Sequence, residues 1–348
     1  MVLFIVSTWG EGKGGHFNTL ATYINGYKGE YHLLVVGKKI PFVLQHFQAK
    51  TTRIDFKWMP KVKCVKDVEV IHCFDQWAYL YGYRLALKYK GIKLILTKSG
   101  GVNAKWFPKA TNMWLISKEN YDFYKNFKVV KHIDYYDNRI IDFPLAELSS
   151  DLQVIKDKST VVLRIGRVSE YYNTSFTAFI KAAKQIKDAK FICIGSVESE
   201  ALRERMVSAN ILVLDNTKYT SNAKQYLSVA DVFVGQGRSA MEAIAKGIPT
   251  FVYNKKNDDL CMVDGNNINE VKWANFSERA NFDFNTRLSS YLEENNNAKV
   301  EELKDFVKYN PNRIVEFYKA TKPQKTKWMY FPVPLFLRYI LRLIKHRR

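Results

Sequence analysis

A glycine loop followed by a helical pattern has the residue types that bind a diphosphate. Gly235 and Gly237 follow the strand-like run 231–234, and Ser239 opens the helical pattern. Glycines allow backbone amides to approach a ligand, and the start of a helix presents N–H groups and a partial positive charge. We therefore predict a diphosphate site made by Gly237, Arg238, Ser239 and Ala240.

A second glycine-rich segment, at residues 10–15, follows a strand-like run and formally matches G-x-G-x-x-G. A dinucleotide site would also need an acidic residue at the end of the second strand, but that run ends in Gly37-Lys38-Lys39. NAD is therefore disfavoured, while NADP remains an alternative. We predict that Gly14 and Gly15 bind a phosphate at a helix start. A tight strand-to-helix turn without a ligand is the structural alternative.

The segment 226–251 resembles the donor site of family 4 glycosyltransferases. In that family a glutamate near the start of the helix hydrogen-bonds the nucleotide ribose, which implies Glu242 as the ribose ligand. The family's second glutamate, eight residues earlier, contacts the donor sugar, and Val234 occupies its position here. The resemblance leaves Gln236 or Arg238 to take over that contact.

Glu242 also has a purely structural interpretation. Ser239 and Glu242 have the S-x-x-E spacing of a capping box, in which the carboxylate satisfies backbone N–H groups at the helix start. The sequence is compatible with both roles.

Two further loops after strand-like runs match the same family, at Gly166-Arg167 and Gly195-Ser196. The first resembles the family's Gly-Arg motif, whose arginine neutralises the donor diphosphate through paired hydrogen bonds. The second resembles the glycine turn below the nucleotide. Asn173 stands near the place of the family's lysine. Charge compensation would therefore fall on Arg167 and the helix start at Ser239, with Arg164 or Arg238 as further candidates.

The first half of the chain resembles the family more weakly. Residues 93–100 resemble a strand that ends in a turn where the family places a histidine near the reacting sugar, and Ser99 occupies that position. His16, beside the glycine segment, and His72 are further candidates. We predict His16 and Ser99 as catalytic residues, although a lone histidine is also a common core residue.

Strand-like and helical patterns alternate along residues 1–135, and the alternation restarts near residue 160. Such alternation builds parallel sheets. We predict an α/β fold with two Rossmann-like, doubly wound domains facing a cleft, the arrangement called GT-B, and a C-terminal basic amphipathic segment. The predicted parts are an acceptor-binding domain at 1–145, a nucleotide-sugar-binding domain at 155–310, and a helix with a membrane-associating tail at 311–348, with an irregular linker at 142–158.

The composition limits the protein class. The 348 residues include 54 Lys+Arg against 34 Asp+Glu, and this net charge of +20 requires an anionic partner. A hydrophobic content of 47% excludes a mostly disordered chain. The four cysteines form no C-x-x-C pair, which favours free thiols in a reducing compartment over disulfides or a zinc ribbon. The apolar run at 2–6 is too short for a signal peptide or a spanning helix.

The positive charge gathers in two stretches rich in aromatic residues. Residues 38–66 carry eight Lys/Arg against Asp55 alone, and residues 322–348 carry eight with no acidic residue. Such stretches suit an anionic membrane surface. The predicted membrane residues are Lys327, Trp328, Phe331, Phe336, Arg338, Arg342 and Lys345. The alternatives are a solvated face for the first stretch and a helix docked on the protein's own surface or a partner for the second.

The resemblance implies transfer of a sugar from a UDP- or GDP-linked donor to a lipid-linked or saccharide acceptor, with retention of configuration. Such a reaction belongs to the synthesis of cell-surface polysaccharide, lipopolysaccharide or glycolipid. The chain has no Asp-x-Asp, so we expect no bound metal, and no cofactor besides the nucleotide-sugar substrate. The expected location is cytoplasmic and peripheral on the inner face of the cell membrane. A nucleotide-sugar epimerase or hydrolase of similar fold is the alternative. A nucleic-acid partner is not expected, because the chain has no helix-turn-helix, zinc or RNP-type motif.

Overall fold

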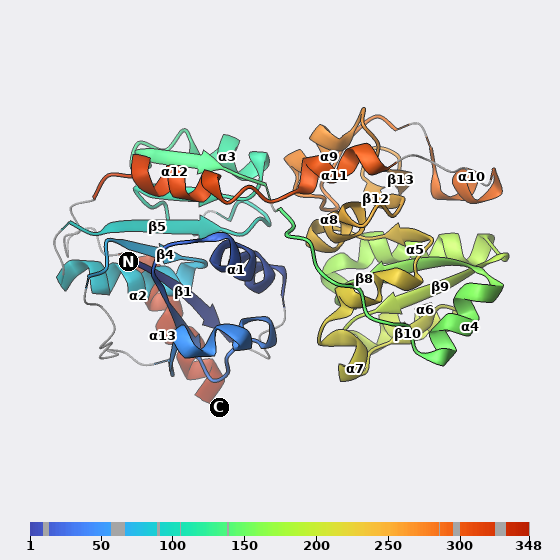
Figure 1. Ribbon diagram of the computed structural model, residues 1–348, viewed down its shortest axis with the longest axis horizontal. Helices are drawn as coiled ribbons and strands as arrows, with labels where there is room; N and C mark the ends of the chain where they lie inside the picture. The colour runs from blue at the N-terminus through green and yellow to red at the C-terminus, as the bar shows by residue number, and fades with distance from the viewer. Residues whose placement is uncertain are drawn as a thin grey trace. The chain divides into compact units, whose positions relative to one another are not determined.

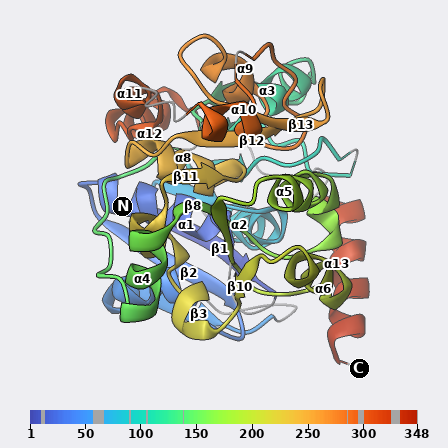
Figure 2. The same cartoon turned by 90° about the vertical axis from the view of Figure 1, so that its right-hand side faces the viewer.

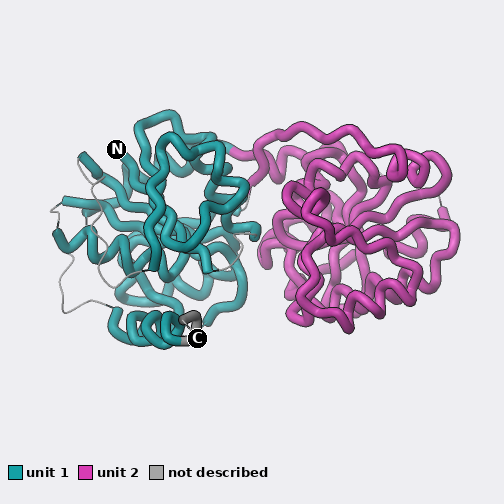
Figure 3. Tube along the Cα trace, turned by 90° about the horizontal axis from the view of Figure 1, so that it is seen from below, with its two compact units in different colours: residues 1–137, 310–348 teal, residues 138–309 magenta. Residues whose placement is uncertain are grey.

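The computed structural model describes residues 1–9, 14–56, 67–88, 91–104, 106–137, 139–284, 286–294, 300–323 and 332–347, with side chains described as far as residue 344. The chain forms two compact units (Figure 3). Unit 1 comprises Met1–Asp137 and Asn310–Arg348, and unit 2 comprises Asn138–Tyr309.

Unit 1 is built on a parallel sheet with the strand order β3-β2-β1-β4-β5-β6-β7. Figure 1 labels its strands β1, β4 and β5. Its strands are β1 Val2–Thr8, β2 Tyr31–Gly37, β3 Thr51–Ile54, β4 Val70–Cys73, β5 Lys93–Lys98, β6 Asn112–Leu115 and β7 His132–Tyr135. Its helices are α1 Gly15–Gly26, the 3₁₀ helix η1 Phe42–Lys50, α2 Gln76–Lys88, α3 Lys118–Tyr124, α12 Asn312–Ala320 and α13 Val333–Arg347. Every residue of β1 and β4 is buried, as expected for central strands of a parallel sheet covered on both faces.

The last two helices are part of the unit 1 core. In α12, the Phe317 ring lies 4.7 Å from the Trp114 ring, and the Tyr318 hydroxyl is hydrogen-bonded to His72 at 2.7 Å. In α13, Leu335 and Tyr339 are 3% exposed and join the core cluster around β4 and α2. The sequence pattern indicated a separate C-terminal helix and tail at 311–348, whereas the buried side chains of α12 and α13 attach these two helices to unit 1.

Unit 2 has a six-stranded sheet with the order β10-β9-β8-β11-β12-β13, in which only β13 is antiparallel to its neighbour. Helices cover both faces, with α5 and α6 on one side and α4 and α8 on the other (Figure 2). Its strands are β8 Thr160–Ile165, β9 Ala189–Ile194, β10 Leu212–Leu214, β11 Val232–Val234, β12 Thr250–Asn254 and β13 Asp259–Met262. Its helices are α4 Ser150–Lys158, η2 Glu170–Tyr172, α5 Asn173–Gln185, α6 Glu200–Ser208, α7 Thr217–Thr220, η3 Ala223–Val229, α8 Gly237–Ala245, α9 Ile268–Trp273, α10 Leu288–Glu293, η4 Glu301–Leu303 and α11 Lys304–Val307.

The predicted fold class is confirmed, because both halves of the chain form parallel-dominated α/β sheets with helices on their faces. The irregular linker that the sequence indicated at 142–158 is confirmed for residues 142–149, which form no helix or strand. Residues 150–158 form α4 instead, and its Leu152 is 2% exposed in the unit 2 core. The helix also has Asp151 in its first turn and Lys156 and Lys158 in its last, which favours it electrostatically.

Three cysteines, Cys73, Cys193 and Cys261, are buried free thiols, and Cys64 lies outside the described residues. No helix among the described residues has the length and hydrophobicity needed to cross a bilayer. Within the same residues, no three His, Cys, Asp or Glu side chains are grouped as metal ligands would be.

Candidate functional site

The unit 2 sheet has a topological switch point at β8. This strand pairs with β9 on one side and β11 on the other, so the chain connections leave it in opposite directions. The carboxyl ends of the parallel strands lie along one edge of the sheet, which we call the carboxyl edge. Ligands of doubly wound sheets bind at this edge, beside the switch point. The loops after β8, β9 and β11 contain Gly166-Arg167, Gly195-Ser196 and Gly235–Gly237. The structure therefore brings three sequence-predicted motifs to one edge.

Gly195 lies against the loop after β8. A Cβ atom at this residue would stand 1.8 Å from the carbonyl oxygen of Gly166, so no side chain fits. The same two loops are joined by a 2.9 Å hydrogen bond from the Val168 N–H to the Ser196 carbonyl oxygen. The glycine at residue 195 is thus required by the close approach of two backbones.

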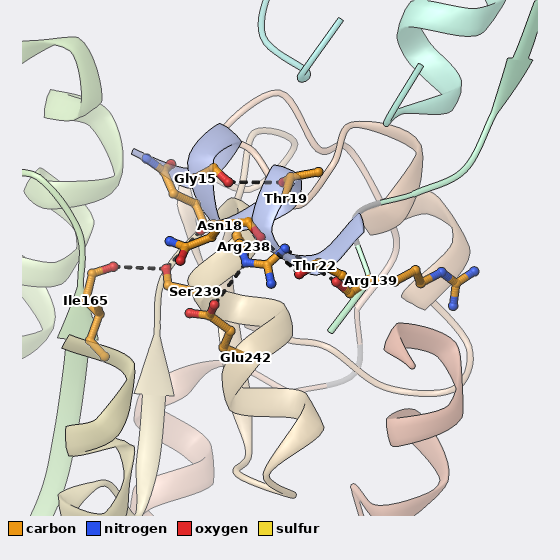
Figure 4. A network of polar contacts seen from close by, with 10 residues as sticks. Gly15, Asn18, Thr19, Thr22, Arg139, Ile165, Arg238, Ser239 and Glu242 are labelled. Carbon is orange, nitrogen blue, oxygen red and sulfur yellow. Dashed lines mark hydrogen bonds and ion pairs between the residues drawn. The ribbon is translucent and has the colours of Figure 1, made fainter. Parts of the chain in front are cut away.

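The first turn of α8 is held by contacts from distant segments. Gly237 has φ +57°, which favours glycine, and its N–H donates to the Phe276 carbonyl oxygen at 2.7 Å. The Ser239 hydroxyl lies 2.9 Å from the Ile165 carbonyl oxygen at the end of β8 and 3.0 Å from the Gln236 carbonyl oxygen (Figure 4). The N–H groups of Arg238 and Ser239 belong to the first turn, where no intrahelical carbonyl is available. They are suited to an anion at the carboxyl edge.

The capping box suggested by Ser239 and Glu242 does not form. The N-cap of α8 is Gln236, and its side chain caps no N–H. The Ser239 hydroxyl is a donor to the Ile165 carbonyl, and the Glu242 carboxylate is bonded to Arg238 instead. The interpretation of Glu242 as the carboxylate of a capping box is therefore wrong.

Glu242 and Arg238 form a buried ion pair on α8. The Arg238 Nε lies 3.0 Å from the Glu242 Oε1, and the two side chains are 8% and 7% exposed (Figure 4). Arg238 also contacts the carbonyl oxygen of Arg139 at 3.4 Å. Nearby, the ammonium groups of Lys224 and Lys246 each lie 4.6 Å from the Phe143 ring. Burial lowers the pKa of Lys224, whereas the Glu242 carboxylate acts to raise it.

The other two predicted arginines have different environments. Arg167 is 47% exposed and forms an ion pair with Glu198 at 3.1 Å, at the rim of the carboxyl edge. Arg164 is a core residue, because it is 2% exposed, lies 4.0 Å from the Phe176 ring and donates to the Ser175 hydroxyl at 2.6 Å. Burial lowers the pKa of Arg164 to about 10. Arg167 is thus accessible to a ligand, and Arg164 is not.

The sequence indicated Gln236 as a candidate but not the other two residues beside the α8 loop, Asn275 and Phe276. Asn275 and Phe276 have φ values of +55° and +54°, a conformation that is uncommon for residues with a side chain. The bulge they form presents the Phe276 carbonyl to Gly237. Gln236 has a buried Oε1 that accepts no hydrogen bond from the described residues. Only Asn275, a residue type that tolerates this conformation, carries a local sequence signal.

In unit 1, the predicted residues lie around the carboxyl ends of the strands. Gly14 is the N-cap of α1 with φ +156°, α1 begins at Gly15, and residues 10–13 of the glycine segment are outside the described residues. The partly exposed His16 ring packs on Phe17 with centroids 3.8 Å apart. Ser99 directly follows β5, and its hydroxyl lies 3.5 Å from the Phe74 carbonyl oxygen. Because β4 separates β1 from β5, His16 and Ser99 follow strands that are not neighbours.

His72 is a structural residue. It is fully buried, its Nδ1 lies 2.7 Å from the Tyr318 hydroxyl, and its Nε2 lies 2.5 Å from the Thr97 hydroxyl. Desolvation lowers its pKa to about 3, so the ring is neutral. Its candidacy as a catalytic group is wrong, because both nitrogens are used within the core.

Asp75 organises the carboxyl edge of unit 1, although it was not singled out in the sequence. Its carboxylate accepts hydrogen bonds from the N–H and hydroxyl of Ser7, which lies in β1, and from the N–H groups of Trp77 and Ala78 in α2. Burial raises the pKa of Asp75, and these four hydrogen bonds act in the opposite direction. An acidic residue just before a helical pattern is the signal that would have found it.

The fold resembles that of solved structures across nearly the whole chain. HepE from Anabaena, in complex with UDP and glucose, matches with a TM-score of 0.64 at 12% identity, over 92% of this chain and 99% of that one. A complex of HepE with UDP matches with a TM-score of 0.62 over the same shares. A structure described as a UDP-N-acetylglucosamine 2-epimerase from Listeria monocytogenes matches with a TM-score of 0.55 at 12% identity, over 91% and 96% of the two chains. No family model and no curated protein sequence matches. These similarities establish a two-domain, Rossmann-like fold.

Proposed function

We propose that the protein is a glycosyltransferase that binds a UDP- or GDP-linked sugar at the carboxyl edge of unit 2. The observation that carries this proposal is the meeting of the Gly166, Gly195 and Gly237 loops beside the first turn of α8. HepE, whose fold is similar, was solved with UDP and with UDP and glucose. Membership of glycosyltransferase family 4 is part of the proposal and rests on the sequence motifs.

The diphosphate end of the donor is assigned to α8 and Arg167. The N–H groups of Arg238 and Ser239 face the anion, and Arg167 exchanges its carboxylate partner Glu198 for a phosphate. As the glycosidic bond breaks, negative charge develops on the leaving diphosphate, and fixed amides and a guanidinium stabilise that charge. This assignment needs no metal ligand from the chain.

The ribose is assigned to Glu242, whose carboxylate is held in place by Arg238. One oxygen of Glu242 is bonded to the Arg238 Nε, and the ribose hydroxyls donate to the carboxylate when the nucleotide binds. A pre-positioned carboxylate loses less conformational entropy on binding than a mobile one.

The donor sugar is assigned to Gln236. Of the two residues that the resemblance left for this contact, Arg238 is engaged by Glu242 and Arg139, whereas the Gln236 Oε1 is a buried acceptor without a donor among the described residues. A sugar hydroxyl would supply that donor.

The acceptor is assigned to unit 1, with His16 and Ser99 as the proposed catalytic groups. A lipid-linked or saccharide acceptor, retention of configuration and a location on the inner face of the cell membrane complete the proposal. The support for the membrane location and the lipid-linked acceptor is the basic and aromatic composition of residues 38–66 and 322–348. Retention of configuration rests on the resemblance to family 4.

The decisive experiment measures nucleotide binding and nucleotide release. Thermal-shift titrations with UDP, GDP and ADP identify the base, and release from a panel of UDP- and GDP-sugars with membrane extract identifies turnover. Arg167→Ala is expected to weaken nucleotide binding, while Arg287→Ala, which removes a half-exposed arginine paired with Asp259, is the matched control. Equal nucleotide affinity in both variants would place the site elsewhere.

A nucleotide-sugar epimerase or hydrolase is the second candidate, favoured by the similarity to the Listeria structure. Such an enzyme needs only the donor and water. Consumption or epimerisation of the nucleotide sugar without any acceptor would support this function over transfer.

A further inference from the structure

We infer that α13 is a two-faced docking helix, which attaches to unit 1 by one side and binds an anionic lipid bilayer with the other. This role rests on the proposed function, for which α13 would be the membrane-contacting element. Lipid binding by the helix is nevertheless measurable without any turnover, so the two proposals fail separately.

The inward side of α13 is fixed to the unit 1 core and to its carboxyl edge. Leu335 and Tyr339 are buried, and the Tyr339 hydroxyl lies 2.5 Å from the Tyr81 hydroxyl of α2. The Arg342 guanidinium lies 4.5 Å from the ring of Trp9, which directly follows β1. The helix is therefore a rigid attachment, held by aromatic and cation–π contacts.

The outward side carries a continuous apolar stripe. With 3.6 residues per turn, Val333, Leu337, Leu341 and Ile344 fall on one face of the helix. Their exposed fractions are 52%, 57%, 67% and 50%. These are aliphatic side chains, and none of them belongs to the unit 1 core cluster.

Cations lie beside this stripe. Arg338 is exposed at its margin and stacks 4.7 Å from the Trp106 ring, which keeps the guanidinium next to the apolar face. Residues 332–348 contain five Lys/Arg and no acidic residue. An apolar stripe on a helix whose charged residues are all basic is complementary to anionic headgroups over acyl chains. Two copies of the same helix would repel each other, so a lipid surface is the better partner.

The structure modifies the set of predicted membrane residues. Phe336 is partly buried against the unit 1 core, and Arg342 is held against Trp9, so these two side chains serve attachment. Lys327, Trp328 and Phe331 lie outside the described residues, as does the side chain of Lys345. The lipid-contacting residues that we infer are instead Val333, Leu337, Leu341 and Ile344, with Arg338 at the margin.

The test is vesicle flotation of the full-length protein. Vesicles of phosphatidylcholine with 30% phosphatidylglycerol are compared with phosphatidylcholine alone, using the wild type, the triple variant Leu337→Ser/Leu341→Ser/Ile344→Ser, and the control Val154→Ser/Val207→Ser. The control removes two exposed valines of unit 2. We expect at least tenfold more binding to anionic vesicles by the wild type, a tenfold loss in the triple variant and no change in the control. Equal flotation of the wild type and triple variant would overturn the inference, as would wild-type protein that does not float.

Two further measurements distinguish lipid contact from dimerisation and from loss of the donor site. Leu341→Cys in a Cys64→Ser background, labelled with an environment-sensitive dye, should show a blue shift with anionic vesicles and none with neutral ones. An unchanged spectrum would contradict contact between this face and lipid. A dimer that is lost in the triple variant, with no lipid binding by the wild type, would identify a second copy as the partner and also overturn the inference. UDP or GDP thermal shifts of the triple variant report on the donor site independently of docking.

Discussion

The Arg238 guanidinium and the Glu242 carboxylate, one helical turn apart on α8, form an ion pair that is almost completely buried. The pair lies at the base of a first turn whose amides are directed to the carboxyl edge of unit 2. It links a residue of the proposed diphosphate site to the proposed ribose ligand, so a change at either side chain is expected to affect both fold and binding.

Glu242→Ala should reduce stability as well as nucleotide affinity. Removing one partner of a buried pair leaves the other charge unpaired, which costs about 3–5 kcal/mol. Urea unfolding of Glu242→Ala is the measurement, with Glu270→Ala on the exposed side of α9 as control, expected within about 0.5 kcal/mol of the wild type. A loss below about 1 kcal/mol in Glu242→Ala would mean that the pair is not buried in solution.

Gly195→Ala and Gly166→Ala should separate packing from binding. A methyl group at residue 195 meets the Gly166 carbonyl oxygen at 1.8 Å, whereas at residue 166 it meets no atom within 4 Å. Gly195→Ala is therefore expected to lose about 1–3 kcal/mol or more of unfolding free energy, as overpacked sites do. Gly166→Ala should fold normally and weaken nucleotide binding only. Chemical unfolding measures the stability of the two variants, and titration with UDP and GDP measures their nucleotide affinity. Equal stability of the two variants would contradict the close approach of the Gly195 and Gly166 backbones.

The sequence predicted the elements better than the contacts between them. Apolar β-branched runs and helical spacing are local, and they predicted both sheets and the glycine loops at the carboxyl edge of unit 2. The partner of Ser239 is the Ile165 carbonyl, 74 residues away, and no local pattern reveals that bond. The sequence of α13 likewise does not indicate which of its two faces is covered. Leu335 is buried and Leu337 is exposed, although both are leucines. Only packing against Tyr81 and Trp9 distinguishes them.

His72 should make the protein less stable in acid. Its pKa is about 3 in the folded chain against 6.5 unperturbed, so between these values the unfolded chain binds a proton that the folded chain does not. The stabilisation is complete above pH 6.5 and is lost as the pH falls below it, by up to about 1.4 kcal/mol per pH unit at 25 °C. Unfolding free energies of the wild type and His72→Asn at pH 4.5 to 7 test this, with the exposed His46→Asn as control. The slope should be smaller in His72→Asn alone, and identical slopes in all three proteins would contradict the assignment.

Gln236 should affect the sugar and not the nucleotide. Its Oε1 is buried at the N-cap of α8 without a donor among the described residues, whereas the nucleotide contacts are assigned to Arg167, Glu242 and the α8 amides. Gln236→Ala is expected to lower kcat/KM for the nucleotide sugar by at least tenfold, which corresponds to about 1.4 kcal/mol of transition-state stabilisation, and to leave the Kd for the free nucleotide unchanged. Gln236→Glu retains an acceptor oxygen and should recover part of the activity, while Gln153→Ala on α4 is the unaffected control. A parallel loss of free-nucleotide binding in Gln236→Ala would show that this side chain supports the loop instead of contacting the sugar.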